Sequence, residues 1–438
     1  MGTQNAPGPQ EKRFAAYIDG LAKAAGHADR EAPLKSYCTG LLLPGQRKSV
    51  EPMAARLAPD NVRRTHQSLH HLVADSPWSD EVLLETVRGS VLHGMKKKGP
   101  VVAWVVDDTG FPKKGKHSVG VARQYCGQVG KQDNCQVAVS LSVTTDYASV
   151  PVAWRLYLPE SWARDGERRQ ATGVPKGISF QTKPAIALSQ IRRAVEHEVP
   201  SAPVLADSGY GNDTEFRQGI TELELLYVVG VHDNTTVWRP DEVPQPKPRR
   251  KGKGRPPTRL HRDAEHKPVS VKELAFSLPH QAWKTVTWRE GTSHKLKSRF
   301  AAVRVHPAHR DHKRSAPHPE EWLLMEWPSE ESEPTKYWLS TLPAQTKLIA
   351  LVRLAKHRWI IERDYQELKQ ELGLGHYEGR GWRGFHHHAT LCIAAYGFLV
   401  LERTRFPPSA RSGRLELRAP AIPPHFQPRG SPHARRTA

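Results

Sequence analysis

Apolar and polar residues alternate with two different periods along the chain, and the change falls near Pro100. Before it, apolar side chains recur at spacings of three and four residues, as in residues 14–18 and 69–73. This spacing places the apolar side chains on one face of a helix. The pattern therefore predicts a helical N-terminal region over residues 1–95.

After Pro100, short apolar runs rich in β-branched residues predict the strands of a buried sheet. The predicted order is three strands, a helix, a strand, a short helix and a last strand. The strands lie at residues 101–106, 136–143, 150–158, 203–206 and 223–231, and the longer helix lies at 184–198. Strands that alternate with helices indicate the α/β class, so we expect an α/β core whose first part is residues 96–232.

The segment after residue 232 has a different pattern. Strand-like runs predict a β-rich insertion over residues 233–342, and they lie at 284–288, 300–305, 321–327 and 337–342. Within this insertion, residues 240–259 are rich in Pro, Lys and Arg, and we interpret them as an exposed basic loop.

Helical spacing returns over residues 343–404, which we expect to complete the core. One helix is expected over residues 345–372 and another over 387–403. Residues 405–438 are crowded with Pro, Arg, Ser and Gly, and this composition predicts a disordered basic tail.

The net positive charge of the chain favours negatively charged partners. Lys and Arg number 65 against 45 Asp and Glu, which gives a formal net charge of +20. Such an excess attracts polyanions, of which nucleic acid is the commonest, although a basic surface without a ligand is the alternative. The four cysteines form no C-x-x-C pair, so neither a zinc knuckle nor a disulfide framework is indicated. We expect no secretory signal and no membrane span, because no apolar run is long enough.

Two carboxylates are candidates for metal binding because of their place after predicted strands. Asp107 and Asp207 each follow a short apolar run. A carboxylate at the end of a rigid strand is well placed to hold a hard cation, whereas the alternative is that each Asp merely opens a turn. The spacing leaves open whether Asp107 or Asp108 is the ligand, and we take Asp107, the first after the strand.

The helix expected over residues 345–372 carries a third candidate carboxylate, Glu362. Arg358, Glu362 and Lys369 stand at positions i, i+4 and i+11, which fall on one face of a helix. The alternative is a solvated helix with Arg–Glu and Glu–Lys ion pairs.

Taken together, three segments resemble the catalytic blocks of DDE insertion-sequence transposases. They are residues 106–109, 206–210 and 357–362. The third resembles the Y-x2-R-x3-E-x6-K signature of the hairpin-forming cut-and-paste group, in which Arg358, Glu362 and Lys369 match R, E and K. Ala355 stands where that group has Tyr. The resemblance extends over roughly residues 30–400, including the Gly- and Lys-rich stretch 110–125.

This resemblance implies a ribonuclease-H-like core and metal-dependent DNA cleavage and strand transfer at the ends of an insertion sequence. Asp107, Asp207 and Glu362 would hold two Mg²⁺ or Mn²⁺ ions, and Arg358 and Lys369 would contact DNA phosphates. The helical N-terminal region, residues 1–95, would bind DNA. The implied partners are the DNA of the terminal inverted repeats and the target DNA, with a dimer when two ends are paired. The implied location is the bacterial cytoplasm, in association with the nucleoid.

Weaker signals concern further contacts with DNA. By the same resemblance, Trp338 would stack on a flipped base, with a buried core Trp as the alternative. Lys253 and Arg255 lie in a segment similar to an AT-hook, or else in a solvated loop. The basic run 46–50 is a candidate for a phosphate contact. Residues 386–388 are three histidines, which we expect to face phosphates or simply to be exposed.

Two other functions remain open. The first is a nuclease of the same fold that cuts without strand transfer, and joining of a pre-cut end to target DNA would separate the two. The second is an inactive DNA-binding remnant of a mobile element, against which the intact Asp107, Asp207 and Glu362 argue.

Overall fold

The computed structural model describes residues 8–246, 259–263, 266–290 and 295–406. The chain divides into two compact units, each built from segments far apart in the sequence. Unit 1 comprises Met1–Pro100, Asp108–Gln181 and Ile361–Ala438, and unit 2 comprises Val101–Asp107 and Thr182–Ile360. The first unit therefore joins the predicted N-terminal helices to part of the predicted core.

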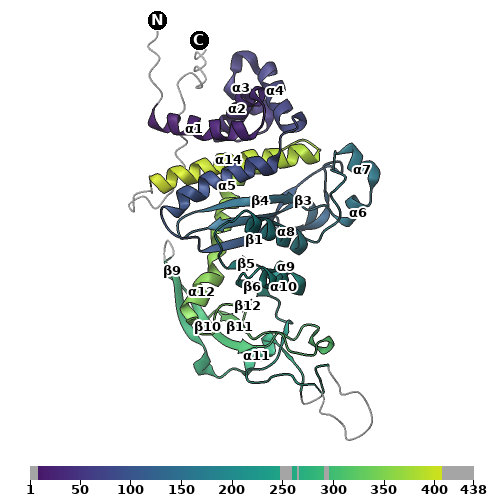
Figure 1. Ribbon diagram of the computed structural model, residues 1–438, viewed down its shortest axis with the longest axis vertical. Coiled ribbons are helices and arrows are strands. Elements are labelled where there is room, and N and C mark those ends of the chain that lie inside the picture. Colours follow the sequence, from purple (N-terminus) through teal and green to yellow (C-terminus); the bar gives the residue numbers. More distant parts are fainter. Residues whose placement is uncertain (1–7, 247–258, 264–265, 291–294, 407–438) are drawn as a thin grey trace, which may run out of the picture. The chain divides into compact units, whose positions relative to one another are not determined.

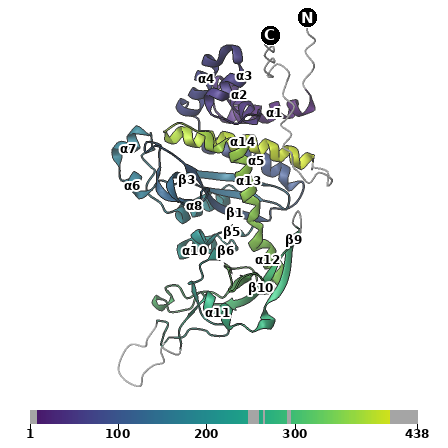
Figure 2. The ribbon, with the colours of Figure 1, turned by 180° about the vertical axis from the view of Figure 1, so that it is seen from behind.

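The N-terminal part of unit 1 is helical, as the sequence predicts. Its α-helices are α1 (Pro9–Ala24), α2 (Glu31–Leu42), α3 (Val50–Leu57), α4 (Val62–His70) and α5 (Asp80–Lys96), joined by the short turns η1 (Ala28–Arg30), η2 (Pro59–Asn61) and η3 (His71–Asp75). Helices α2, α3 and α4 pack against one another (Figure 2). Their buried residues are mostly Leu, Met and Ala at helical spacing, which explains why this group folds together.

One long helix organises unit 1. Helix α14 (Trp382–Arg405) packs against α2, α5, η3 and β4 (Ser149–Leu156). Figure 1 shows it, in yellow-green, between the N-terminal helices and the strands of this unit. Contact on every side buries most of its side chains, so α14 lacks the polar face of an ordinary surface helix.

The strands of unit 1 form an antiparallel group. Strand β3 (Lys131–Thr144) pairs with β2 (Ala122–Cys126) along its first part and with β4 along its second. Strand β1 (Ala103–Pro112) is the next neighbour of β3 in the sheet, and its second half belongs to this unit. The short helices α6 (Glu160–Ala163) and α7 (Gly166–Ala171) follow β4, and η6 (Leu374–His376) precedes α14.

Unit 2 contains the parallel strands. The first half of β1 pairs in parallel with β5 (Val204–Ala206), and β5 pairs in parallel with β6 (Tyr227–Val231). Helix α8 (Lys183–Glu196) precedes β5, while α9 (Ser208–Gly211) and α10 (Thr214–Glu222) connect β5 to β6. The mixed sheet with its intervening helices confirms the α/β class that the sequence predicts.

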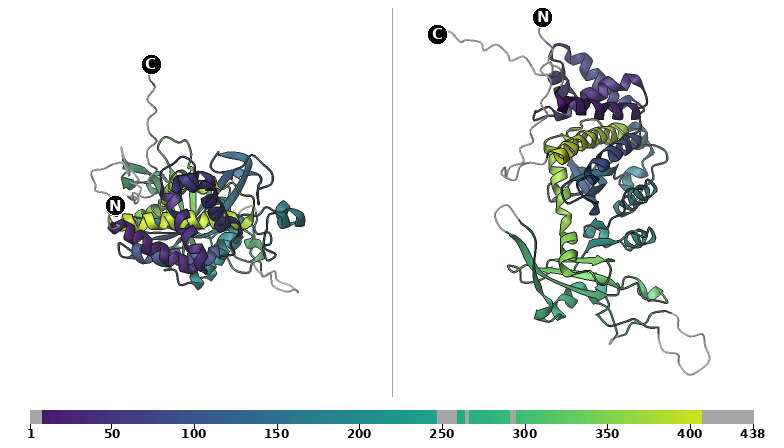
Figure 3. Two further views of the ribbon diagram at one scale, coloured as in Figure 1. Left: turned by 90° about the horizontal axis from the view of Figure 1, so that it is seen from above. Right: turned by 60° about the vertical axis from the view of Figure 1, so that its left-hand side comes forward.

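The predicted insertion is β-rich, and its strands continue the same sheet. Strand β12 (Lys336–Ser340) pairs antiparallel with β6, and β11 (Glu321–Trp327), β10 (Lys295–Val305) and β9 (Lys284–Glu290) follow in that order. Figure 3 shows β9 and β10 as two long neighbouring strands, which pair antiparallel. The rest of the insertion holds β7 (Thr236–Val237), β8 (Val269–Ser270), α11 (Val271–Ser277), η4 (His280–Ala282) and η5 (Asp311–Lys313).

Two predicted boundaries are wrong. The expected helix over residues 345–372 is two helices, α12 (Leu348–His357) and α13 (Trp359–Gln370), with Arg358 as the C-cap of α12. Strand β1 runs on to Pro112, so Asp107 lies within a strand and not after one. Asp207 does follow its strand, at the N-cap of α9.

Parts of two predictions lie outside the described residues. They are residues 247–258 of the basic loop, with Lys253 and Arg255, and residues 407–438 of the tail. Among the described helices, none is long and apolar enough to cross a membrane.

Candidate active site

Two aspartates lie side by side because their strands are neighbours. Strands β1 and β5 pair with Trp104 opposite Val204 and Val105 opposite Leu205. Continued by two residues, this register places Asp107 beside Asp207. The apolar residues just before each Asp are buried, so both carboxylates start from a rigid base.

Arg358 joins the two carboxylates. Its Nη2 atom lies 2.8 Å from Oδ1 of Asp107 and 3.3 Å from Oδ2 of Asp207. Because both oxygens lie within bonding distance of one nitrogen, the two carboxylates must be close together. The Asp107 side chain is 14% exposed and that of Asp207 is 42% exposed, so the pair lies at the border between core and solvent.

Asp207 has a second role in the local fold. Its Oδ1 atom accepts a hydrogen bond from the backbone N–H of Gly209 at 2.9 Å, which caps the N-terminus of α9. The other carboxylate oxygen is the one that faces Arg358. The cap therefore fixes the direction of the side chain toward Asp107.

The geometry also bears on the choice between Asp107 and Asp108. Consecutive residues of a strand point to opposite faces of the sheet. Asp107 pairs with the same Arg358 that pairs with Asp207. Asp107 thus shares a partner with Asp207, and the choice of Asp107 over Asp108 as the ligand stays a prediction.

Glu362 and Lys369 lie on α13, in the part of that helix that belongs to unit 1. The Glu362 side chain is exposed, while Ile361 and Leu368 are fully buried and fix the helix in the core. The Lys369 Nζ atom donates to the backbone oxygen of Gly110 at 2.8 Å and to Oε1 of Gln128 at 3.1 Å. Lys369 thus contacts the second half of β1.

The structure brings together Asp107, Asp207 and Arg358 in unit 2, whereas Glu362 and Lys369 lie on α13 in unit 1. Within the described part of the chain, no three Asp, Glu, His or Cys side chains form a cluster that would hold a metal ion. The Asp107–Asp207 pair is therefore the central feature of the candidate site.

Comparison with known proteins identifies the family. A family model described as a DDE superfamily endonuclease matches residues 20–295, more than half of the chain. The chain belongs to the DDE superfamily endonucleases. Because this superfamily has a ribonuclease-H-like core, the match also confirms the core that the sequence predicts.

One curated relative is similar over part of its length. The chain is 34% identical over 190 residues to a probable transposase for insertion sequence element IS701 from Microchaete diplosiphon. The similarity covers 43% of this chain and 46% of the relative, so the chain spans about half the length of the curated relative that it matches. The family match includes Asp107 and Asp207 and ends before Glu362.

This DDE endonuclease contains a buried carboxylate that sequence analysis missed. Asp364 lies on α13, two residues after Glu362, and is almost fully buried. It accepts hydrogen bonds from the hydroxyl groups of Ser149 on β4 and Tyr396 on α14. Burial raises the pKa of Asp364 to about 7. No sequence signal distinguishes it from an exposed helical Asp, because its two partners are more than 30 residues away.

A second missed group lies at the end of α12. Lys356 Nζ bonds to Oε1 of Glu326 on β11 at 2.7 Å and lies 4.7 Å from the centre of the Trp288 ring. Burial lowers the pKa of Lys356, while the adjacent Glu326 carboxylate opposes this shift. This buried pair ties α12 to the strands of the insertion.

The three histidines at residues 386–388 are not exposed, contrary to the sequence-based expectation. All are buried in α14. His388 Nε2 donates to the backbone oxygen of Gly373 at 3.0 Å, and its Nδ1 accepts from the hydroxyl of Tyr37 at 2.8 Å. Burial lowers the pKa of His388 to about 4. The hydrogen bonds of these histidines link α14 to the elements around it.

Lys48, the centre of the basic run 46–50, is also buried. Its Nζ atom donates to the backbone oxygens of Leu41 at 2.6 Å and of Leu43, at the end of α2. Arg47 forms an ion pair with Glu378. The expected phosphate contact is therefore wrong for Lys48, because its amino group is bonded within the protein.

Trp338 lies on β12 and is 8% exposed. It is paired opposite Gly230 of β6 and Leu324 of β11, and Lys356 Nζ lies 5.6 Å from the centre of its ring. This burial agrees with the core alternative, and base stacking by Trp338 stays a prediction.

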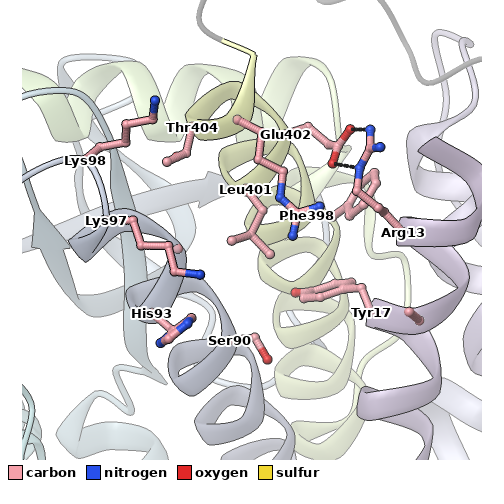
Figure 4. Close-up of a pocket in the computed structure, with 13 residues that line it drawn as sticks. Arg13, Tyr17, Ser90, His93, Lys97, Lys98, Phe398, Leu401, Glu402 and Thr404 are labelled. Atoms are coloured by element: carbon pink, nitrogen blue, oxygen red, sulfur yellow. Dashed lines mark hydrogen bonds and ion pairs between the residues drawn. The ribbon is translucent and has the colours of Figure 1, made fainter. Parts of the chain in front are cut away.

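A basic cleft of about 550 Å³ lies in unit 1 between α1 and the C-terminal ends of α5 and α14 (Figure 4). The Lys and Arg side chains that line it are Arg13, Lys97, Lys98 and Arg405, and His93 lines it as well. Arg13 is paired with Glu402 across the cleft. The lysines stand where two helix C-termini carry partial negative charge, so the helix ends already account for their presence.

Helix α4 presents a different polar surface. Arg63, Arg64, Gln67 and Ser68 are exposed, and Leu69 is the buried residue of the helix. The helix contains no Asp or Glu. It follows α3 after the turn η2 and packs against α3. An exposed helix with Arg, Gln and Ser side chains suits contact with DNA base edges and phosphates.

Proposed function

We propose that this protein is a DNA transposase that cleaves DNA at the ends of an insertion sequence and joins those ends to target DNA. The observation that carries the proposal is the Asp107–Asp207 pair on adjacent parallel strands, in a chain of the DDE endonuclease family. Similarity to a probable IS701 transposase supports the proposal that the DNA cleavage serves transposition.

The donor atoms of the candidate site suit divalent cations. Asp107 and Asp207 offer carboxylate oxygens, and both already share one cationic group, the Arg358 guanidinium. Mg²⁺ is commonly held by one or two carboxylates together with substrate phosphates. We propose that Asp107 and Asp207, with Glu362 as the third ligand, hold two Mg²⁺ or Mn²⁺ ions.

When bound, such ions activate the attacking oxygen and stabilise the leaving oxygen of an in-line displacement. The rigid strands β1 and β5 hold Asp107 and Asp207 in place for this task. Arg358 and Lys369 match the Arg and Lys of the Y-R-E-K signature, and we assign them to phosphates next to the scissile bond. A guanidinium can bind a phosphate through two parallel hydrogen bonds, which fixes its orientation.

We propose that the N-terminal helices recognise the terminal inverted repeats. Helix α4 offers Arg63, Arg64 and Gln67 on an exposed face without carboxylates. Arg pairs with guanine and Gln with adenine in the major groove. Pairing of two ends requires two protein copies on DNA, and the protein would act on the nucleoid of the bacterial cytoplasm.

The experiment is incubation of the purified protein with labelled DNA that carries the element's own end, in the presence of Mg²⁺. Products are resolved on a denaturing gel. A cut at the element boundary, absent without Mg²⁺, is the expected result. Uncut DNA with the wild-type protein would contradict the proposal, and cutting without joining of pre-cut ends would favour a nuclease.

A further inference from the structure

Arg358 contacts both aspartates of the candidate site. One atom of its guanidinium, Nη2, is within hydrogen-bonding distance of both Asp107 and Asp207. A divalent cation shared by these two residues needs the same two carboxylates. Arg358 and such a cation would therefore compete for the same two carboxylates.

The attraction between Arg358 and the two carboxylates favours this competition. An Arg guanidinium is not deprotonated in proteins, so loss of a proton cannot relieve the contact. The Arg358 side chain is 27% exposed and that of Asp107 is 14% exposed, so solvent screens their attraction only in part. Removal of this positive charge should make the carboxylate pair more attractive to a second cation.

The backbone on either side of Arg358 is anchored separately. Lys356 is paired with the buried Glu326 of β11, and the guanidinium of Arg289 lies 3.6 Å from the centre of the Trp359 ring. These contacts hold the junction after α12 against the strands of the insertion. The long Arg358 side chain can therefore change partner while its backbone stays in place.

We propose that Arg358 blocks the Asp107–Asp207 pair against divalent cations until a DNA phosphate takes the guanidinium away. The phosphate is a fitting alternative partner, because its oxygens match the hydrogen-bonding fork of Arg. In this arrangement DNA binding and cation binding support each other. The inference rests on the proposed function, since it assumes that Asp107 and Asp207 hold a cation.

The test measures Mn²⁺ affinity without DNA, by calorimetric titration of the full-length protein. The variants are Arg358→Ala and Arg358→Gln, and Arg353→Ala serves as the matched control because Arg353 is an exposed Arg of α12, the helix that ends at Arg358. Mn²⁺ binding that is lost in Asp207→Asn is assigned to this site. The rise in melting temperature on addition of Mn²⁺ provides a second readout for any variant of low stability.

We expect Arg358→Ala and Arg358→Gln to bind Mn²⁺ at least about tenfold more tightly than the wild type, and Arg353→Ala to match the wild type. Cleavage of end DNA by Arg358→Ala should nevertheless fall, because the phosphate contact is lost. Equal or weaker Mn²⁺ binding in both Arg358 variants, with binding still abolished by Asp207→Asn, would overturn this inference alone. Mn²⁺ binding that Asp207→Asn leaves unchanged would instead contradict the metal site of the proposed function.

Discussion

At the scale of single residues, Asp107, Asp207 and Glu362 are proposed to bind cations and not DNA. We predict that Asp107→Ala, Asp207→Ala and Glu362→Ala each reduce end cleavage by orders of magnitude, because each removes a proposed ligand of a two-metal site. Cleavage rates and DNA affinities are measured in parallel. DNA binding should remain near the wild-type level.

Asp108→Ala is the matched control for this set, since Asp108 is the neighbour of Asp107 on β1. It should lower cleavage much less than Asp107→Ala. If Asp108→Ala were the more damaging change, the first ligand would move by one residue. Near-normal cleavage by any of the other three variants would remove that residue from the proposed set.

From the sequence we singled out Asp107, Asp207 and Arg358 as candidates, but their arrangement could not be predicted. It placed Asp107 after a strand, because Asp-Asp-Thr-Gly resembles a turn; in the structure β1 continues, with β3 as its neighbour in the sheet. It placed Arg358 within one helix, because residues 345–372 contain neither Gly nor Pro. The break at Arg358 coincides with its pairing to two distant aspartates, which no local pattern records.

At the scale of elements, α14 is held by polar bonds as well as by apolar packing. His388 bonds to Tyr37 of α2 and to the backbone oxygen of Gly373, and burial lowers its pKa to about 4. Because the unfolded chain binds this proton near pH 6.5 and the folded protein does not, the contribution of His388 is complete above that pH. It is lost as the pH falls from about 6.5 to 4.

We therefore predict that the free energy of unfolding declines over this pH range, with His388 contributing about 3 kcal/mol to the decline. Chemical denaturation at several pH values measures it. His388→Gln should be less stable at pH 7 and should show a smaller decline on acidification. An equal decline in wild type and variant would mean that His388 is not held neutral by the fold.

The histidine triplet also shows a limit of pattern reading at this scale. Three consecutive polar residues normally indicate an exposed helical face or a solvated turn. Here α14 is enclosed by α2, α5, η3 and β4, so all three side chains are buried and bonded to backbone atoms. The enclosing elements come from distant parts of the sequence, whereas local periodicity predicted many of the longer elements but missed β2, α6 and α7.

Helix α4 carries a further prediction at the scale of elements. Arg63→Ala, Arg64→Ala and Gln67→Ala should each weaken binding to the element's end by about tenfold, about 1.4 kcal/mol, because base contacts are lost. Fluorescence anisotropy with end DNA and with scrambled DNA measures the effect. Arg192→Ala, an exposed Arg on α8, is the control and should not alter the preference for the end. Unchanged preference in all three α4 variants would assign recognition to another element.

At the scale of the whole molecule, the net charge of +20 should govern DNA binding. Each neutralised phosphate contributes a slope of about −0.9 in the logarithm of affinity against that of salt concentration. We predict a steep fall in affinity between low and moderate salt, for end DNA and for unrelated DNA alike. Titrations at several salt concentrations measure the slope. An affinity that does not change with salt would contradict a phosphate-based interface.

We propose that this DDE endonuclease uses Asp107 and Asp207 both to cut DNA and to join it. The most direct measurement supplies the purified protein with a labelled, pre-cut element end, a target plasmid and Mg²⁺, and follows covalent joining on a denaturing gel. The account predicts joined product with the wild type and none with Asp207→Ala at equal DNA binding. Joining by Asp207→Ala at the wild-type rate, or no joining by an intact wild type that binds the end, would contradict it.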